Sequence, residues 1–335
     1  MALPEVRPVY ASVIVPVFNG ADTLGDCLAA LAHQTIGAER YEVLVVDDGS
    51  TDPSAQVAAR MGVPVIRQEH AGAGPARNRG AQQARGQVLL FTDADCQPER
   101  DWIEQMLAPF ADPEVVGVKG AYRTRQRSPV ARFAQAEYEE KYARLARQKQ
   151  IDFVDTYAAA YRRDLFLAHG GFDPAFLLDE DQEFSFRLAR AGCKLVFASA
   201  AVVYHRHPAT VWSYVQRKVH LGRWKVQVHV RYPAQAVRDS YTPWTQKAQL
   251  LLLPLTGAAA LAAALGLVPW GPALVLAGLG WATTLPLLLR AARQGWPVVA
   301  VTPFLALLRA LALAVGLGWG LVELKNLTHR KERRK

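Results

Sequence analysis

The chain has 335 residues, a formal net charge of +9, and a composition that is 51% hydrophobic and 21% charged. This length allows one large domain with an appendage, or two domains. The three cysteines are widely spaced and form no CxxC pair, which suits a reducing compartment. No apolar signal region precedes the first predicted strand, so we expect no cleaved targeting peptide. Basic residues flank a strongly apolar C-terminal region without any recognised nucleic-acid motif. We therefore expect membrane lipid, and no nucleic acid, as the partner of this charge.

Strand and helix signals alternate before Tyr241. Short apolar runs predict four strands, at residues 12–17, 42–46, 63–66 and 88–91. Pro75 suits the first turn of a helix over about 76–85. The alternation predicts an α/β fold, with a mostly parallel sheet and helices on both faces.

Candidate binding residues lie at the ends of three of the predicted strands. They are Phe18 with Asn19, Asp47 with Asp48, and Asp93 with Asp95. Ligands of parallel sheets bind beyond the carboxyl ends of the strands, so we expect these residues to share one cleft. Asp93 and Asp95 are carboxylates one residue apart at the end of a buried strand, where a divalent cation supplies the charge compensation they need. Taken alone, the same pair is more often a solvated turn.

Six motifs, in this order, resemble those of family 2 glycosyltransferases with the GT-A fold, of the membrane-anchored bacterial type. The resemblance covers roughly Ala11 to Trp224. The motifs are SVIVPVFNG (12–20), VVDDGSTD (45–52), GAGPARNRG (72–80), FTDAD (91–95), GGFD (170–173) and EDQEFSFRLARAG (180–192). The resemblance implies a Rossmann-like nucleotide-diphospho-sugar transferase fold.

The resemblance also implies a nucleotide-sugar donor, a UDP- or GDP-sugar, lying across the strand ends. Phe18 would lie against the base, and Asp48 would accept from its ring N–H. Arg77 and Asn78, at a helix N-terminus, would suit the diphosphate. A plain turn with a helix cap is the alternative for Asp48, and a solvated helix face is the alternative for Arg77. The donor-binding residues implied in this way are Pro16, Phe18, Asp48, Arg77, Asp93 and Asp95.

Asp93 and Asp95 resemble the DxD pair of metal-dependent transferases. Asp95 would reach Mn²⁺ or Mg²⁺, and Asp93 the ribose or a metal-bound water. A hard cation suits this reaction because it neutralises the nucleoside diphosphate as it leaves. In similar enzymes a histidine at the position of His205 completes the metal site or touches the diphosphate. A surface histidine in a basic patch is an equal alternative.

In the family, the aspartate of the ED pair is the general base, which here is Asp181. It would deprotonate an acceptor hydroxyl during a single inverting displacement. Glu180 and Glu183 are the fallbacks, and Glu180 is also a candidate contact for acceptor or diphosphate. Acidic residues at a helix start often only compensate the helix dipole, which is the plain alternative. Residues 170–173 resemble the family's acceptor-side loop.

The segment His220-Leu-Gly-Arg223-Trp224 resembles the QxxRW motif of membrane-linked synthases. His220 replaces the glutamine, which puts processive polymerisation in doubt. Arg223 would contact phosphate, and Trp224 would stack on a sugar or lie at the membrane interface. An amphipathic helix on the bilayer surface is the alternative.

Two apolar segments, 248–268 and 271–289, are each long enough to span a bilayer. A third, 298–322, carries Arg309 near its middle, where a charge is costly or functional. We expect it to be re-entrant, interfacial or a third span. The positive-inside rule places the catalytic domain on the cytoplasmic side of the inner membrane. The expected parts are a catalytic domain (1–204), an interfacial segment (205–245), a transmembrane region (246–324) and a basic cytoplasmic tail (325–335).

These features predict a multi-pass membrane glycosyltransferase that uses a divalent metal and acts on a lipid-linked or surface-glycan acceptor. One alternative is a polyprenyl-phosphate glycosyl synthase, which attacks with a phosphate oxygen and needs Asp181 less. Another is a non-catalytic nucleotide-sugar-binding membrane protein, or a subunit of a glycan exporter. The presence of Asp93, Asp95 and Asp181 argues against that second alternative.

Overall fold

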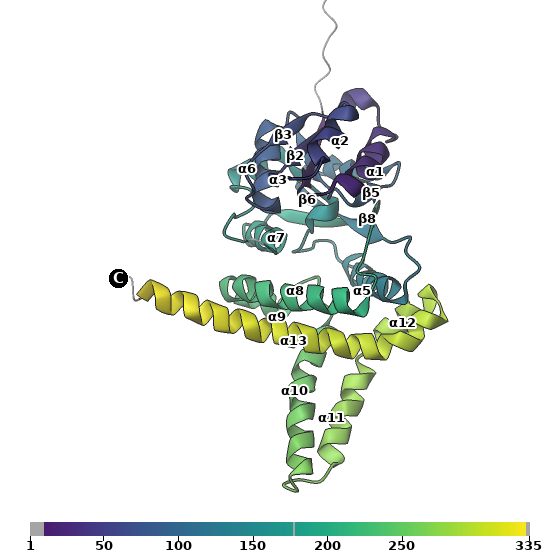
Figure 1. The fold of residues 1–335 in the computed structure, drawn as a ribbon, viewed down its shortest axis with the longest axis vertical. Helices are drawn as coiled ribbons and strands as arrows, with labels where there is room; N and C mark the ends of the chain where they lie inside the picture. The colour runs from purple at the N-terminus through teal and green to yellow at the C-terminus, as the bar shows by residue number, and fades with distance from the viewer. Residues whose placement is uncertain (1–9, 177, 333–335) are drawn as a thin grey trace, which may run out of the picture. The chain divides into compact units, whose positions relative to one another are not determined.

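The computed structural model describes residues 10–176 and 178–332, with the backbone alone for residue 236 and residues 326–332. The chain forms two compact units, residues 1–125 with 145–206, and residues 126–144 with 207–335 (Figure 1). The observed boundary after 206 lies close to the expected one after 204. Residues 126–144, however, group with the C-terminal part and not with the catalytic domain to which the sequence assigned them. The N-terminal residues 1–9 and the side chains of most of the expected basic tail lie outside the described residues.

The first unit contains an eight-stranded sheet with the order β3-β2-β1-β4-β7-β6-β8-β5. The strands are β1 (Ala11–Val17), β2 (Tyr41–Asp47), β3 (Val65–Arg67), β4 (Val88–Phe91), β5 (Cys96–Pro98), β6 (Val115–Arg123), β7 (Ala159–Arg162) and β8 (Lys194–His205). Strands β1 to β4 pair in parallel, as do β6 and β8. Strand β7 is antiparallel to both of its neighbours, and β5 is antiparallel to β8. The predicted α/β sheet is confirmed, and its second half is mixed.

Helices connect and cover this sheet. They are α1 (Ala21–Ala32), α2 (Ser54–Arg60), α3 (Ala73–Gln83), α4 (Trp102–Leu107), α6 (Arg163–Ala168) and α7 (Glu180–Arg190). All seven residues of β1 are buried, as expected for a central strand paired on both sides. A cluster of aromatic rings, with centroids 5.0 to 6.2 Å apart, packs β4 and β7 against α6, α7 and the loop before α7. This cluster fixes the start of α7 beside the end of β4.

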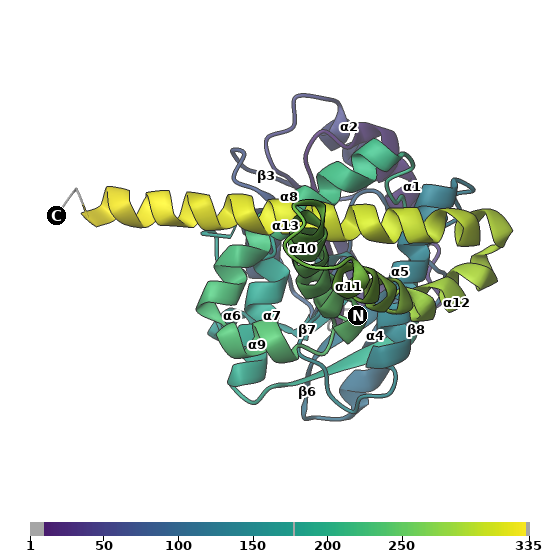
Figure 2. The same cartoon turned by 90° about the horizontal axis from the view of Figure 1, so that it is seen from below.

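The second unit is helical. Its members are α5 (Pro129–Leu145), α8 (Val211–Arg231), α9 (Pro233–Arg238), α10 (Trp244–Ala264), α11 (Gly271–Ala282), α12 (Leu285–Gln294) and α13 (Trp296–Glu332). Helices α8 and α13 run side by side, and α10 and α11 form a hairpin that lies crosswise to them (Figures 1 and 2). Within the described residues, two helical stretches are long and apolar enough to cross a membrane, 244–264 and 296–325. They correspond to the first and third predicted apolar segments.

The second predicted segment, 271–289, is not straight. Helices α11 and α12 are bent by 41° relative to each other, so they form a third candidate span only if the bent pair counts as one. At the bend, the hydroxyls of Thr283 and Thr284 donate to backbone carbonyls three residues earlier, at 2.6 and 2.7 Å. Pro286 follows without an N–H to continue the ladder. Side-chain competition and a missing donor therefore account for the bend.

Glycines allow α8 and α13 to touch along their backbones. A Cβ added at Gly316 would lie 2.2 Å from the carbonyl oxygen of Val219, and one at Gly222 would lie 2.6 Å from that of Leu313. Small residues at a helix contact permit such close approach. Farther along the same contact, Arg223 donates to both carboxylate oxygens of Glu323, at 2.7 and 2.6 Å. The sequence suggested phosphate for this guanidinium, whereas the structure engages it with Glu323.

Candidate active site

The loops after β1 and β2 hold each other in place. Asn19 adopts a left-handed backbone conformation (φ 51°), and its Oδ1 accepts from the backbone N–H of Thr51 at 2.8 Å. Asp52 accepts from the N–H of Ala21 in the first turn of α1, at 3.0 Å. These hydrogen bonds fix the loop that carries Phe18. The Phe18 side chain is 47% exposed and stacks on His70, with ring centroids 4.0 Å apart. The structure therefore presents Phe18 as an aromatic surface at the strand ends. Pro16 is buried within β1 just before it.

Asp48 is buried and fully engaged. Its carboxylate accepts from Gln68 Nε2 at 2.7 Å, and from the N–H groups of Ala71 and Gly72 at 2.9 and 2.8 Å. His70 Nδ1 lies 2.9 Å from the second oxygen. A carboxylate offers about four acceptor positions, and these contacts fill them. In this structure Asp48 holds the loop after β3. A base N–H can bind to it only in place of one of these partners, and His70, with 57% of its side chain exposed, is the partner open to solvent.

Arg77 connects two acidic motifs that lie far apart in the sequence. It is 4% exposed, so it does not form part of an open helix terminus. Its Nη2 donates to Asp93 at 2.6 Å and its Nη1 donates to Glu180 at 2.7 Å. Gly74, one turn earlier, makes this possible, since a Cβ there would lie 3.1 Å from Cγ of Glu180. Arg77 thus joins the end of β4 to the start of α7.

Asp93, Asp95 and Cys96 form a cluster that could hold a metal ion, with one ligand atom from each lying within 4.8 Å of the others. His205 Nε2 lies 3.2 Å from Asp95 Oδ2, so β8 brings the predicted histidine to the same place. Burial, together with the charges of Asp93 and Asp95, raises the pKa of the Cys96 thiol well above its usual value. A protonated thiol is a poor ligand for a hard cation, so the carboxylates and His205 fit Mn²⁺ or Mg²⁺ better than Cys96 does.

Asp181 lies in the first turn of α7, where its oxygens accept from the N–H groups of Gln182 and Thr156 at 2.7 and 3.3 Å. Desolvation raises the pKa of Asp181 above its ordinary value, although Arg77 opposes that effect. Burial also raises the pKa of Glu180, and the charge of Asp181 adds to the rise. Carboxyls whose pKa values are shifted by burial and by neighbouring charges are candidates for proton transfer.

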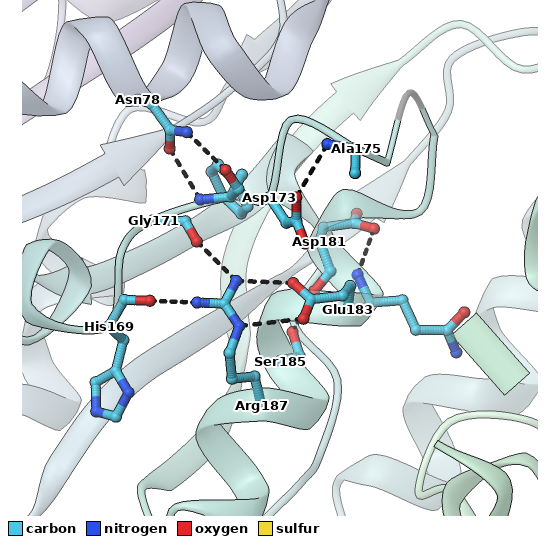
Figure 3. Close-up of polar contacts among 11 residues, drawn as sticks. Asn78, His169, Gly171, Asp173, Ala175, Asp181, Glu183, Ser185 and Arg187 are labelled. Atoms are coloured by element: carbon cyan, nitrogen blue, oxygen red, sulfur yellow. Dashed lines mark hydrogen bonds and ion pairs between the residues drawn. The ribbon is translucent and has the colours of Figure 1, made fainter. Parts of the chain in front are cut away.

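The other predicted acid, Glu183, has a structural role. Its carboxylate is completely buried and receives two hydrogen bonds from Arg187, at 3.1 and 2.7 Å (Figure 3). Arg187 also donates to the carbonyl oxygens of His169 and Gly171. A residue held in this way cannot take a proton from a substrate. The fallback assignment of Glu183 as a base therefore has no support in the structure.

Asn78, predicted near the diphosphate, instead fastens the loop of residues 170–173. Its Nδ2 donates to the carbonyl of Phe172 at 2.7 Å, and its Oδ1 accepts from the N–H of the same residue at 2.9 Å (Figure 3). This pairing positions the segment that the sequence identified as an acceptor-side loop.

Comparison with known proteins agrees with this geometry. Residues 12–170 match the family model described as Glycosyl transferase family 2. This segment is a family 2 glycosyltransferase domain. The glycosyltransferase AglE of Haloferax volcanii is 29% identical over 65% of the chain and 74% of its own length. The pre-mycofactocin glycosyltransferase of Mycobacterium tuberculosis is also 29% identical, over 69% of the chain and 49% of its own length.

Solved structures confirm the GT-A fold for this glycosyltransferase domain. The mannosyltransferase PcManGT of Pyrobaculum calidifontis, solved with GDP-Man and Mn²⁺, has a TM-score of 0.66 and 25% identity, covering 93% of this chain and 88% of that one. Glucosyl-3-phosphoglycerate synthase of Mycobacterium tuberculosis has a TM-score of 0.50 and 20% identity, over 66% and 79% of the two chains. The second likeness shows the fold alone. The first extends beyond the catalytic unit to nearly the whole chain.

Proposed function

We propose that the chain transfers a sugar from a nucleotide-sugar to a lipid-linked acceptor at a membrane, with a divalent metal and inversion at the anomeric carbon. The observation that carries this proposal is the link through Arg77, which joins the acidic pair after β4 to the acidic pair that opens α7. The pair after β4 is suited to the departing diphosphate, and the pair that opens α7 is suited to the incoming nucleophile. A shared arginine keeps the two at a fixed separation.

On the donor side, Phe18 offers a stacking surface for the base, and Asp48 offers an acceptor once His70 has moved away. Asp93, Asp95 and His205 would hold Mn²⁺ or Mg²⁺. A cation bound there would neutralise the negative charge that develops on the diphosphate. PcManGT was solved with GDP-Man and Mn²⁺, which supports this assignment by similarity.

On the acceptor side, Asp181 is the proposed general base. Its oxygens already accept two backbone N–H bonds, which orient the carboxylate without neutralising it. A raised pKa makes it a stronger base than an ordinary aspartate, so it removes the acceptor proton more readily as the new bond forms. Glu180 stays paired with Arg77 and supports Asp181 by position.

The apolar helices of the second unit support a membrane location. We infer that α10 crosses the bilayer and that the bent pair of α11 and α12 returns. Because α13 lies crosswise to this hairpin, we infer that it runs along the membrane surface with α8. This arrangement keeps the C-terminal part of α13 on the cytoplasmic side, as the positive-inside rule requires.

The test is sugar transfer by the full chain in lipid vesicles, with Mn²⁺, a panel of UDP- and GDP-sugars, and lipid acceptors. General-base catalysis is worth roughly 10² to 10⁴ in rate, so Asp181→Asn should lose about that factor. The matched control is Asp164→Asn, an exposed aspartate on α6, which should transfer at the wild-type rate. If the Asp181 variant also transfers at that rate with every donor, the assignment of the base is wrong.

A second candidate, transfer to the phosphate of a lipid, is favoured by one observation. The second unit buries two cations, Arg309 and Lys218, on a single carboxylate, Glu137. An acceptor whose nucleophile is a phosphate oxygen would need Asp181 less. The two candidates differ in the effect of Asp181→Asn, which should be about tenfold or less for a phosphate nucleophile.

A further inference from the structure

A cavity of about 250 Å³ lies among α10, α11 and α13 in the second unit. Its walls are apolar or small, and Thr256, Gly280 and Ala306 are among them. The Thr256 hydroxyl donates to the carbonyl of Leu252 at 2.7 Å, so it does not require a polar occupant. Pockets for whole small molecules measure about 300–1,000 Å³. This cavity therefore suits a segment of an apolar chain.

The helices around the cavity expose a large apolar surface. Only 11% of the apolar window of α10 is buried, and Leu255 on α10 and Leu274 on α11 are 54% and 67% exposed. Apolar exposure of this extent is typical of a membrane-embedded surface. A hydrocarbon chain is the occupant that such surroundings supply.

One end of the cavity is polar. Gln249, in the second turn of α10, lines it and is 7% exposed. Its Oε1 accepts from Arg309 Nη2 at 2.7 Å, whereas its Nε2 is buried and donates to no acceptor among the described residues. A buried donor without an acceptor is costly, so an occupant that brings an oxygen acceptor is favoured. Thr256 lies seven residues farther along α10, about 10 Å away by helix geometry. The cavity thus has a polar end and an apolar end.

The polar end carries an excess of positive charge. Arg309 Nη1 and Lys218 Nζ both contact Glu137, at 2.9 and 3.0 Å, and all three side chains are largely buried. In the same cluster, Arg309 Nε is buried and donates to no acceptor among the described residues. Two cations therefore share one carboxylate, and a buried guanidinium N–H lacks an acceptor. Buried charges are stable when they are paired, so an anionic group is the complementary ligand.

We propose that this cavity binds the chain of a phosphorylated lipid, the acceptor of the transfer reaction, with its phosphate at the Gln249 end. The proposal rests on the second candidate under the proposed function, transfer to a lipid phosphate, because it names the acceptor of that reaction. The polar end lies near the start of α10 and the apolar end toward the turn of the hairpin. A lipid inserted in a bilayer has the same order of head and chain.

Two glycines of α11 give a matched test. A Cβ at Gly280 or at Gly278 meets nothing within 4 Å, so both positions accept a side chain, but only Gly280 lines the cavity. The full chain in phosphatidylcholine vesicles is titrated with farnesyl phosphate, and binding is measured directly. Gly280→Leu should weaken binding at least tenfold, while Gly278→Leu should stay within twofold of wild type. Equal affinities for both variants would overturn the proposal.

Gln249→Glu tests the polar end. It keeps the oxygen that accepts from Arg309 but replaces the amide donor with a negative charge. Farnesyl phosphate should bind at least tenfold more weakly to this variant, and farnesol should be unaffected. If phosphatidylglycerol competes as well as farnesyl phosphate does, the cavity binds bulk lipid and the acceptor assignment fails.

The outcomes also separate this inference from the proposed function. If wild type transfers sugar and Gly280→Leu transfers equally well to farnesyl phosphate, the function stands and the cavity assignment fails. If farnesyl phosphate binds as described but no nucleotide-sugar is turned over, the cavity assignment stands and the proposed function fails.

Discussion

Arg77 is buried among acidic side chains, and its two terminal nitrogens donate hydrogen bonds to Asp93 and Glu180. Burial alone would lower the pKa of this guanidinium, but Asp93 and Glu180 outweigh burial and raise it. It is therefore a permanent cation at the centre of the site. Its position determines the separation between the groups proposed for the leaving group and for the nucleophile.

Replacing Arg77 should destabilise the first unit. Removal of one partner from a buried ion pair costs about 3–5 kcal/mol, because it leaves an uncompensated charge. Arg77→Met should therefore lower the free energy of unfolding by about that amount, as measured by denaturant titration. Arg79→Met, an exposed arginine on the same helix, is the control and should stay within about 0.5 kcal/mol of wild type. Equal effects of the two changes would contradict the role given to Arg77.

The pH dependence of transfer should reflect the raised pKa of Asp181. A general base acts in its deprotonated form, so kcat/KM should fall as pH drops through that pKa, above the ordinary aspartate value of 3.8. Glu180→Gln removes an adjacent negative charge, so the acidic limb should move to lower pH. A limb that stays in place in this variant would argue against coupling of the two carboxyls.

The sequence was most informative about residues that form contiguous motifs at strand ends. Asp95 and His205 lie within 3.2 Å of each other, as the resemblance implied. The sequence was less informative about which side chains these residues contact. Arg77 pairs with acidic residues because α3 approaches α7. The carboxylate of Asp48 is fully hydrogen-bonded because the loop after β3 folds back onto it. Such contacts are set by tertiary packing, and His70, which stacks on Phe18, carried no motif that could have identified it.

Helices α8 and α13 approach each other closely along their backbones in the second unit. Three glycines, Gly222, Gly316 and Gly320, bring the backbones together, and the pair Arg223–Glu323 adds a bidentate ion pair. Gly316 and Gly320 are four residues apart, the spacing that places small residues on one helix face. The sequence offered an amphipathic helix around residues 220–224 as an alternative, and an apolar segment at 298–322, but it did not predict that the two segments pair. A spacing of glycines does not identify the partner helix.

Adding a methyl group to α13 should distinguish packing from helix propensity. At Gly316 a Cβ would lie 2.2 Å from a backbone oxygen of α8, whereas at Gly318 it meets nothing within 4 Å. Gly316→Ala should lower the unfolding temperature in detergent by several degrees, about 1–3 kcal/mol. Gly318→Ala should leave it unchanged or raise it slightly, since alanine favours helix by about 1 kcal/mol. The reverse order would show that the helices do not pack in this way.

Glu137 on α5 gives the second unit an acid-sensitive contact. Burial raises its pKa, but Lys218 and Arg309 outweigh burial and lower it from 4.5 to about 2. A carboxyl with a lowered folded-state pKa stabilises the protein above its unfolded pKa, and that contribution disappears as pH falls from about 4.5 toward 2. Thermal unfolding of Glu137→Gln should show a weaker loss of stability over this interval than wild type. An identical loss would exclude Glu137 as its source.

The whole chain combines an α/β catalytic unit with a helical unit whose members include residues 126–144. The sequence placed that segment in the catalytic domain, which was expected to cover residues 1–204. Its Glu137 pairs with Lys218 and Arg309, which are much later in the chain, and this pairing accounts for the regrouping. The charge in the third apolar segment, predicted to be costly or functional, is therefore balanced by α5.

Membrane orientation follows at this scale. If α10 crosses the bilayer and the bent pair returns, the turn between α10 and α11 lies outside the cell and the end of α12 lies inside. Val268→Cys, in that turn, should react with a membrane-impermeant maleimide in intact cells. Arg293→Cys, an exposed position on α12, should react only after permeabilisation. Labelling of both positions from the same side would show that the hairpin enters and leaves by one face.

The two acidic motifs are proposed to act on different substrates, Asp93 and Asp95 on the donor with its metal and Asp181 on the acceptor. Nucleotide binding, measured beside turnover, separates these two roles. Titration of the full chain with the active nucleotide-sugar, with and without Mn²⁺, should show Mn²⁺-dependent binding for wild type and for Asp181→Asn. Asp95→Asn should lose that dependence. Transfer by Asp181→Asn should fall by about 10² or more despite normal binding. Loss of Mn²⁺-dependent binding in Asp181→Asn, or its retention in Asp95→Asn, would contradict this assignment of roles.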